Sequence, residues 1–431
     1  MRKRFGLAVL VFVMTVLVWG NEKMIKAAVQ NVQVMNGMTA NADVCAGDSG
    51  YIQPAAENLT DYLGQPVTVA QWSYSVYDED IIKVEQDGRY EAVSPGSTTV
   101  VVNGYSVYGD TLFSASCYFN VSINMTDVTL ETNQIKGYIT GYESFSADVK
   151  INSAYPINDE NSVFSYQSSD RDVSVRCDLY DNALHVECYS SGSTALTIVI
   201  NGKSFVLQIN VSKLEISRRS NVSSKGKTFK LRIKGTSEKP VWSSSNSRVV
   251  KVSANGTVKC RKKGNAVITA SIGGKKLGCA VSVITPKMLK VIKRAKKIGS
   301  TWKYSQPKRM QTGYYDCSSL VWKSYSQIGK KFGMANYAPV AADLAKWCKQ
   351  HGKTLAKSYT SGQIQKMKFM PGDLMFETGQ NNGRYKGIYH VEMFVGYSVS
   401  YYDESGKPVL LELWAARPEG YYGGGGLMMR P

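Results

Sequence analysis

Three segments of the chain repeat one pattern, and this repeat limits the possible folds more than any other feature of the sequence. Each segment opens on an aromatic residue followed by serine-rich residues, and then reaches a glycine that precedes alternating apolar residues. These residues are Trp72 and Gly96, Tyr166 and Gly192, and Trp242 and Gly264, which are 24, 26 and 22 residues apart. Repetition at this length indicates tandem units that each have a core of their own.

Residues 51–285 have the composition of short strands. Runs rich in Val, Ile, Thr and Tyr alternate with Gly, Asn, Asp and Ser, and no long period of 3.6 residues is present. The third copy, NGTVKCRKKGNAVITASIGGKKLGCAVSV, resembles the group-two bacterial immunoglobulin-like domains, and the second copy resembles them least. The resemblance implies two-sheet sandwiches that act as stalks or as adhesive, wall-contacting units. We expect spacers, because no pocket chemistry is visible in them.

The first 27 residues predict export. Three cations precede an apolar stretch in MRKRFGLAVLVFVMTVLVWG, and small residues follow where a signal peptidase could cut. A retained membrane anchor is the alternative, although we expect no integral anchor after signal removal. The expected division is therefore a signal peptide at 1–27, an N-terminal segment at 28–50, modules at 51–125, 126–212 and 213–285, and a final domain at 286–431.

Charge divides the exported chain into two halves. Residues 28–212 hold 7 Lys/Arg against 22 Asp/Glu, whereas residues 213–431 hold 40 against 11. A basic half suits an anionic cell-wall polymer, although a solvated face would give the same count. No nucleic-acid-binding motif accompanies the cations, so we expect no nucleic-acid partner.

Beyond Pro286 the periodicity becomes helical. KMLKVIKRAKKIG places Met288, Ile292, Ala295 and Gly299 on one face of a predicted basic helix. A second helix is predicted from Cys317 to a stop at Gly329, with Asp316 as its N-cap. This places the Cys317 thiol in a first turn, where the helix dipole favours a thiolate.

A nucleophilic thiolate needs a proton shuttle, and this region contains two histidines. His351 follows a predicted helix and precedes a glycine, which is typical of a C-terminal cap. His390 opens the apolar strand HVEMFVGY and is the better candidate base. Cys348 with His351 cannot form a closed zinc site, so we expect neither a metal nor a cofactor.

The order DCSSLV, PGDLMF, YHVEMFVGY resembles the NlpC-type family of peptidoglycan peptidases over most of residues 300–420. The resemblance implies an α+β papain-like cysteine peptidase domain behind three all-β immunoglobulin-like sandwiches. By this resemblance, Cys317 attacks an amide carbonyl and His390 transfers the proton. Tyr304, Asp316 and Ser318 are expected to bind substrate. The family commonly has glycine where Ser319 stands and again where Glu392 stands, so the substrate wall can differ here.

The group that orients His390 is expected on the strand after the His390 strand, as in the resembled family. In VLLELWAA the polar side chain is that of Glu412, whose burial in an apolar run would be explained by pairing with His390. A solvent-facing Glu412 is the alternative. Glu392 competes because alternation places it on the same strand face as His390, and a slip of one residue would bring in Trp414.

Six further cysteines divide into one pair for each repeat, with Cys45 in the segment ahead of the first module, which predicts the disulfides 45–117, 177–188 and 260–279 in an exported protein. The resemblance implies a secreted, wall-associated enzyme that acts on peptidoglycan stem peptides, typically at the D-Glu to diamino-acid bond. A wall amidase or an acyltransferase on the same fold remains open. So does a wall-binding adhesin with an inactive peptidase domain.

Overall fold

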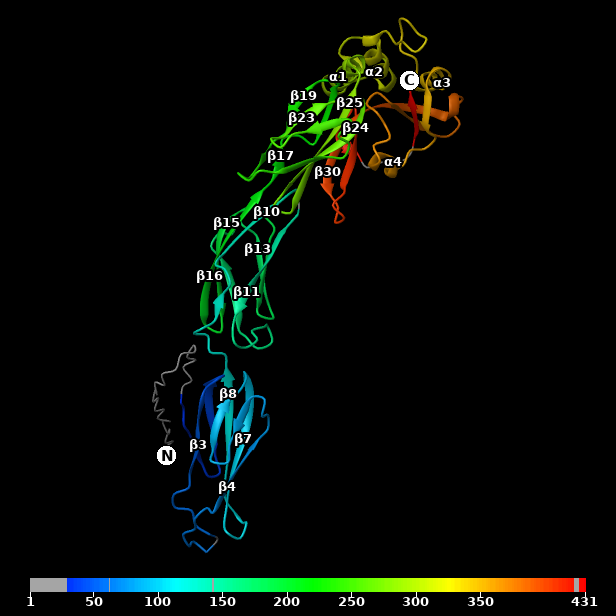
Figure 1. Cartoon of the computed structure of the whole chain (residues 1–431). Coiled ribbons are helices and arrows are strands. Elements are labelled where there is room, and N and C mark those ends of the chain that lie inside the picture. Colours follow the sequence, from blue (N-terminus) through cyan, green and yellow to red (C-terminus); the bar gives the residue numbers. More distant parts are fainter. Residues whose placement is uncertain (1–28, 62, 142, 422–425) are drawn as a thin grey trace. The chain divides into compact units, whose positions relative to one another are not determined.

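The computed structural model describes residues 29–61, 63–141, 143–421 and 426–431, with the backbone alone for 417–421 (Figure 1). The expected signal peptide lies outside these residues. The chain divides into two compact units. The first comprises Met1–Lys136, Ser146–Cys188 and Gly192–Asn210, and the second comprises Gly137–Phe145, Tyr189–Ser191 and Val211–Pro431. Among the described residues, no helix combines the length and the hydropathy needed to cross a bilayer.

Three β-sandwiches follow one another along the chain. The first has sheets ordered β1 (Val32–Met35), β3 (Ser49–Ala55), β6 (Arg89–Ala92), β5 (Ile82–Val84) and β2 (Thr39–Cys45), β8 (Thr111–Ser122), β7 (Gly96–Tyr105), β4 (Gln71–Val76). The second has β10 (Gln134–Ile139), β16 (Lys203–Lys213), β15 (Gly192–Ile200), β12 (Phe164–Ser168) and β13 (Val175–Tyr180), β14 (Ala183–Cys188), β11 (Phe145–Asn152), β9 (Thr129–Leu130).

The third sandwich repeats this plan. Its sheets are β18 (Ser220–Ser224), β25 (Lys275–Ile284), β24 (Gly264–Ile272), β21 (Val241–Ser244) and β19 (Thr228–Lys230), β23 (Thr257–Cys260), β22 (Val250–Val252), with a short pair of β17 (Glu215–Ile216) and β20 (Ile233–Lys234). In all three sandwiches the strand that carries the repeated aromatic pairs with the strand that the repeated glycine begins. The sequence repeat is therefore a repeat of one sheet.

The repeated glycines have a steric cause. Gly96, Gly192 and Gly264 have φ values of 150°, 158° and 148°, which L side chains rarely adopt. A Cβ at Gly96 would lie 2.6 Å from Ile81, and one at Gly192 would lie 2.5 Å from Val173. A side chain at Gly96 or Gly192 would therefore collide with a residue just ahead of a strand of the opposite sheet, and one at Gly264 would lie 3.0 Å from Val249.

Residues 28–50, which the sequence analysis separated from the first module, supply strands to it. β1 pairs in parallel with β3, and β2 pairs in parallel with β8. Val34 and Val44 are buried in the same core as Val100 and Val102 of β7. The first sandwich therefore begins near residue 29, because these strands complete both of its sheets.

The three expected disulfides are wrong, since all eight cysteines are free thiols. Cys45 pairs with Ser122 while Cys117 pairs with Ala40, so five residues of strand separate the two thiols. Cys177 lies opposite Val186 instead of Cys188. Cys260 and Cys279 share one apolar core without a bond between them.

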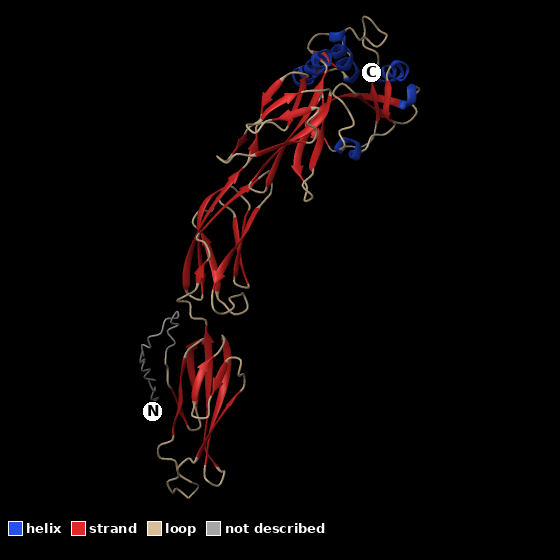
Figure 2. Cartoon of the chain, viewed as in Figure 1, coloured by secondary structure: helices blue, strands red, loops and turns tan. Residues whose placement is uncertain are grey.

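The C-terminal region combines helices with an antiparallel sheet (Figure 2). Its helices are α1 (Pro286–Thr301), α2 (Cys317–Tyr325), α3 (Ala341–His351) and α4 (Ser361–Gln365), with 3-10 turns at Ser326–Ile328 and Tyr385–Gly387. The sheet order is β28 (Lys353–Ala356), β33 (Leu427–Arg430), β29 (Leu374–Thr378), β30 (Ile388–Tyr402), β31 (Pro408–Trp414), β32 (Arg417–Tyr421), and β26 (Lys303–Tyr304) pairs with β27 (Tyr314–Tyr315).

Both predicted helices form. In α1, Ile292 and Ala295 are buried as expected, and a Cβ on Gly299 would lie 2.0 Å from the Ala415 carbonyl oxygen. Glycine at this position lets α1 approach the sheet closely. The helix that starts at Cys317 ends in a 3-10 turn whose cap, Gly329, has a left-handed φ of 78°. Helices α1, α2 and α3 share one core with β29 and β30.

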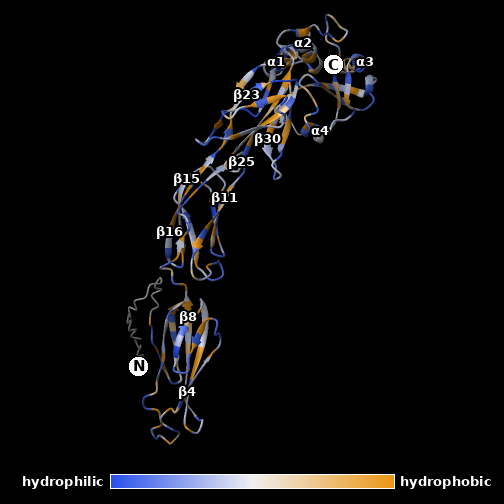
Figure 3. Ribbon diagram, in the orientation of Figure 1, coloured by the Kyte–Doolittle hydropathy of each residue, from blue (hydrophilic) through white to orange (hydrophobic). Residues whose placement is uncertain are grey.

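The third sandwich and the C-terminal region share a second core. β25 is buried at eight consecutive positions, because one of its faces lines the sandwich interior and the other meets the C-terminal sheet. Val267 and Ala280 pack with Phe394, Tyr397 and other aromatic residues of the C-terminal region. Figure 3 shows hydrophobic residues along both β25 and β30. The third module is thus a structural layer of the C-terminal unit and not a separate spacer.

Candidate active site

The site is built around the first turn of α2. Asp316 caps this helix: its carboxylate accepts a hydrogen bond from the Ser319 backbone N–H at 2.7 Å, and the Ser319 hydroxyl accepts one from the Asp316 backbone N–H at 2.8 Å. This capping box starts the helix at Cys317. The Cys317 thiol therefore lies where the free amides and the helix dipole stabilise negative charge by about 0.3–1 kcal/mol.

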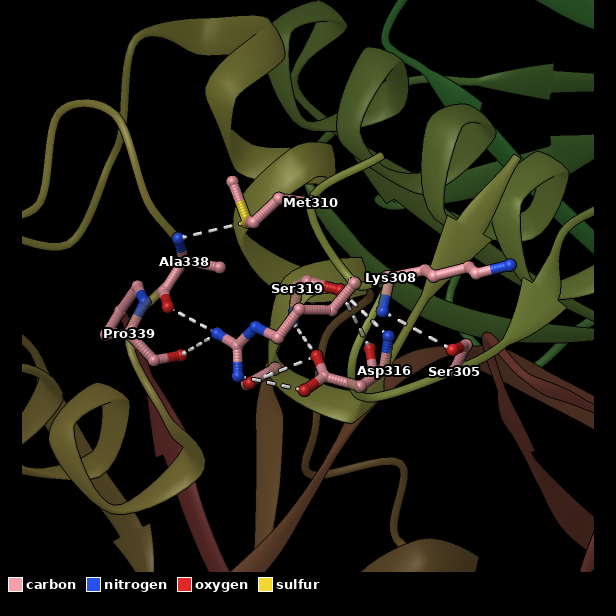
Figure 4. Close-up of polar contacts among 9 residues, drawn as sticks. Ser305, Lys308, Met310, Asp316, Ser319, Ala338 and Pro339 are labelled. Atoms are coloured by element: carbon pink, nitrogen blue, oxygen red, sulfur yellow. Dashed lines mark hydrogen bonds and ion pairs between the residues drawn. The ribbon is translucent and has the colours of Figure 1, made fainter. Parts of the chain in front are cut away.

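A buried arginine holds this helix start in place, and Figure 4 labels its partners Asp316, Ala338 and Pro339. Arg309 Nη1 donates to Asp316 Oδ2 at 2.9 Å, and the two side chains are 10% and 5% exposed. Arg309 Nη2 donates to the backbone oxygens of Ala338 and Pro339. Arg309 was not predicted from the sequence, because nothing in QPKRMQTGYYDC distinguishes this cation from its neighbours.

Two expected substrate-binding residues are therefore structural. Asp316 is 4% exposed, and its carboxylate is bound by Arg309 and by the helix N-terminus. Ser318 is 1% exposed, and its hydroxyl donates to Asp316 Oδ1 at 3.3 Å. Both side chains are buried and support the start of α2, and their expected part in substrate binding stays a prediction.

His390 lies beside Cys317, and Glu392 lies on the other side of the imidazole ring. His390 Nε2 is 3.5 Å from Glu392 Oε1, and the Glu392 side chain is 8% exposed. The pKa of His390 is raised to about 10, first by its hydrogen bond with Cys317 and next by its hydrogen bond with Glu392, against the opposing effect of burial. The ring is therefore held as an imidazolium between two acidic groups.

These residues line a small cavity of about 50 Å³. Its lining is Tyr304, Tyr315, Cys317, Leu320, His390, Val391, Glu392, Met393, Ala415 and Ala416. Tyr304 is 53% exposed and packs edge-on against Tyr315, with ring centroids 5.6 Å apart. Burial and the neighbouring Cys317 raise the pKa of the Tyr304 hydroxyl. Tyr304 thus lies where the sequence analysis expected a substrate-contacting tyrosine.

Glu412 does not orient His390, so that expectation is wrong. Glu412 is fully buried and lies opposite Tyr397, seven residues along β30 from His390, which is roughly 23 Å of strand. The Tyr359 hydroxyl donates to Glu412 Oε1 at 2.9 Å. Trp414, the other candidate on this strand, pairs with Phe394. Alternation along the His390 strand, which singles out Glu392, was the informative signal.

The second cysteine and histidine of the region have packing roles. Cys348 is fully buried, and burial raises the pKa of its thiol to about 12. His351 stacks on Trp347 with ring centroids 4.6 Å apart. Among the described residues, no three His, Cys, Asp or Glu side chains gather as a metal site.

Comparison with known families identifies one part of the chain. Residues 210–281 match the model of the bacterial Ig-like domain (group 2). This match covers the third sandwich, so the expected resemblance is confirmed there. The match ends before α1 and therefore does not bear on the C-terminal region. No curated protein matches the chain.

Two solved structures align with parts of the chain at low identity. Invasin, a bacterial integrin-binding protein, aligns at 15% identity and a TM-score of 0.32, over 52% of this chain and 54% of the invasin chain. A C-terminal fragment of intimin, solved with its receptor's intimin-binding domain, aligns at 12% identity and a TM-score of 0.27, over 53% of this chain and 84% of that fragment. This chain thus spans about half the length of invasin.

Proposed function

We propose that the chain is a cysteine hydrolase that cleaves an amide bond in peptidoglycan stem peptides. The observation that carries this proposal is the alignment of Cys317, at a helix N-terminus, with the His390 imidazole and the buried Glu392 carboxylate. A thiol, an imidazole and an orienting polar group in this order form the triad of papain-like enzymes. The NlpC-type resemblance of DCSSLV and YHVEMFVGY supports the same reading.

In the proposed reaction, the Cys317 thiolate attacks the amide carbonyl carbon, and the carbonyl oxygen becomes an oxyanion bound by the Cys317 backbone N–H. The imidazolium of His390 then gives its proton to the amide nitrogen as the C–N bond breaks, which releases the amine and leaves a thioester. Water attacks the thioester while His390 accepts its proton. Collapse of this second intermediate expels the thiolate and yields a carboxylic acid product.

Glu392 has the role that the sequence analysis gave to Glu412. Its carboxylate accepts a hydrogen bond from Nε2 of the imidazolium, which leaves Nδ1 for the Cys317 sulfur. This contact fixes the ring orientation and favours the charged ring. Glu392 is a positioning residue, since it acts through His390.

The substrate assignment rests on the NlpC-type resemblance, which favours the D-Glu to diamino-acid bond. A wall amidase or an acyltransferase would use the same groups on a different bond. Mass spectrometry of purified peptidoglycan after incubation with the full chain separates these reactions: the D-Glu bond yields a shortened stem, an amidase detaches the whole stem from the glycan, and an acyltransferase leaves a new amide. Unchanged muropeptides would contradict the hydrolase.

A wall-binding adhesin with an inactive C-terminal domain is the second candidate, and the group-two Ig-like match at residues 210–281 supports a binding role. The two candidates differ in one measurement. An adhesin binds wall and releases no fragment, and Cys317→Ala leaves it unchanged. We propose in either case a secreted, wall-associated protein, because the apolar N-terminus predicts export and the basic half suits an anionic wall.

A further inference from the structure

The third sandwich exposes one face of its smaller sheet, formed by β19, β23 and β22. Its larger sheet is covered on both sides, by the sandwich core and by the C-terminal sheet. In Figure 1, β19 and β23 lie on the side of the sandwich opposite to β30. The outer face of the β19–β23–β22 sheet is therefore the broad surface that this module leaves to solvent.

This face is cationic by its strand register. Alternation points Phe229, Val258 and Val250 into the core. Lys230, Lys251 and Lys259 point outward, and Arg261 follows the end of β23; all four are exposed, and we call them the lysine face. Lys251 and Lys259 are direct cross-strand partners, so their Cβ atoms lie about 5 Å apart.

Such a like-charge pair destabilises a sheet unless a counter-charge is near. Residues 213–285 hold 17 Lys/Arg against 2 Asp/Glu, and β19, β22 and β23 carry no acidic residue. Within the described part of the chain, no ion pair involves any residue of the lysine face. The face therefore presents uncompensated charge at a cost to stability, which an external anion would remove.

The geometry also indicates the kind of anion. Lys259 lies on β23, Arg261 follows directly after this strand ends at Cys260, and Lys251 on β22 lies about 5 Å from Lys259. Cationic side chains at this spacing suit a polymer whose negative charges repeat along its length. Between Lys225 and Lys263 the exposed large hydrophobic side chain is Val241, on the other sheet. The face thus has neither an aromatic platform for bases nor apolar anchors for a bilayer.

We propose that the lysine face binds a linear phosphodiester polymer without bases, of the kind that makes a bacterial wall anionic. Binding here neutralises the Lys251–Lys259 pair and releases counterions from the polymer. This inference does not depend on the proposed hydrolysis, since the face belongs to the sandwich and contains no residue of the Cys317 cavity. The proposal places the wall binding expected of the basic residues 213–431 on the lysine face.

The test measures binding of the full chain to immobilised long-chain polyphosphate over a series of NaCl concentrations. We expect the triple variant Lys251→Gln, Lys259→Gln, Arg261→Gln to bind at least about tenfold more weakly, with a log–log salt slope lower by roughly 2. Its thermal midpoint should not fall, because the variant removes a repulsive pair.

The matched control removes three exposed cations from the C-terminal region, with Lys353→Gln, Lys357→Gln and Lys366→Gln. We expect this control to bind polyphosphate within about threefold of the parent. Equal losses in the two triple variants would overturn the proposal, since binding would then follow net charge alone. Tighter binding of the parent to single-stranded DNA or to anionic vesicles than to polyphosphate would also overturn it. Turnover of peptidoglycan plays no part in this test.

Discussion

At the scale of single side chains, the two thiols of the C-terminal region have opposite environments. Cys317 is partly exposed beside His390, whereas Cys348 is fully buried with its pKa raised to about 12. We expect Cys317→Ala to lower peptidoglycan hydrolysis by at least about 1,000-fold, because the covalent step is lost. Cys348→Ala should keep turnover within a few-fold. Circular dichroism checks folding, and hydrolysis by a folded Cys317→Ala variant would remove the mechanism.

Glu392 should contribute, together with Cys317, to the alkaline limit of activity. The pKa of His390 is raised to about 10, so the imidazolium persists at neutral pH and is lost as the pH rises through that value. Removing the Glu392 carboxylate in Glu392→Gln removes one cause of this rise. We therefore expect the alkaline limb of kcat/KM to move down by roughly one to three pH units.

The comparison for this prediction is Glu412→Gln, which removes a buried carboxylate seven residues further along the paired strands. The alkaline limb of its kcat/KM profile should lie at the same pH as in the parent, even if its thermal midpoint falls. Glu392→Asp, which restores the charge, should recover part of the shift. If the alkaline limb of kcat/KM in Glu392→Gln is unchanged, a group other than Glu392 orients His390.

At the scale of elements, one ion pair ties the start of α2 to the loop at residues 338–339. Arg309→Ala leaves the buried Asp316 carboxylate without its cation, and breaking a buried pair in this way costs about 3–5 kcal/mol. We expect chemical denaturation to show a loss of this size. Arg309→Lys keeps the charge without the planar fork and should lose less. A loss below about 1 kcal/mol in Arg309→Ala would show that other contacts hold α2.

Strand length determines which acidic residue meets His390. β30 has 15 residues, and β31 pairs with it from Tyr402 back to Phe394, so β31 ends before it reaches His390. An orienting residue on β31 would need a longer strand or a different register. The nearest buried carboxylate on the same face is then Glu392, two residues along β30 itself.

At the scale of the whole molecule, the third sandwich and the C-terminal region should unfold together. Asn265 donates from Nδ2 to the backbone oxygens of Met367 and Phe369, and Thr269 Oγ1 is 2.8 Å from the Tyr402 hydroxyl oxygen. We expect residues 213–431 to melt in one calorimetric transition. Residues 286–431 alone should melt at least about 10 °C lower, because part of the shared core is exposed.

Two outcomes would contradict this prediction. One is two separate transitions in residues 213–431, and the other is an unchanged midpoint for residues 286–431. The control is removal of residues 29–212, which do not contribute to this shared core. The thermal midpoint of residues 213–431 should then equal the midpoint that this part has in the full chain.

The sequence by itself determined the features that depend on neighbouring residues. Spacing of aromatics and glycines located three sandwiches, because each repeated glycine meets one local steric requirement. Helical periodicity and the Asp316 cap located the helix that begins at Cys317, since capping acts within four residues. Cys317 and His390 were predicted as a pair from residue type and order, and the structure places their side chains in hydrogen-bonding contact.

Only the tertiary structure decided the features that depend on strand pairing and on packing between distant segments. The strand register places Cys45 away from Cys117, Cys177 away from Cys188, and Glu412 away from His390. A shift of register changes every such partner while the sequence pattern stays the same. The buried ion pair of Arg309 and the packing of β25 against the C-terminal sheet depend on contacts between distant segments. Such contacts produce no periodic pattern in the sequence.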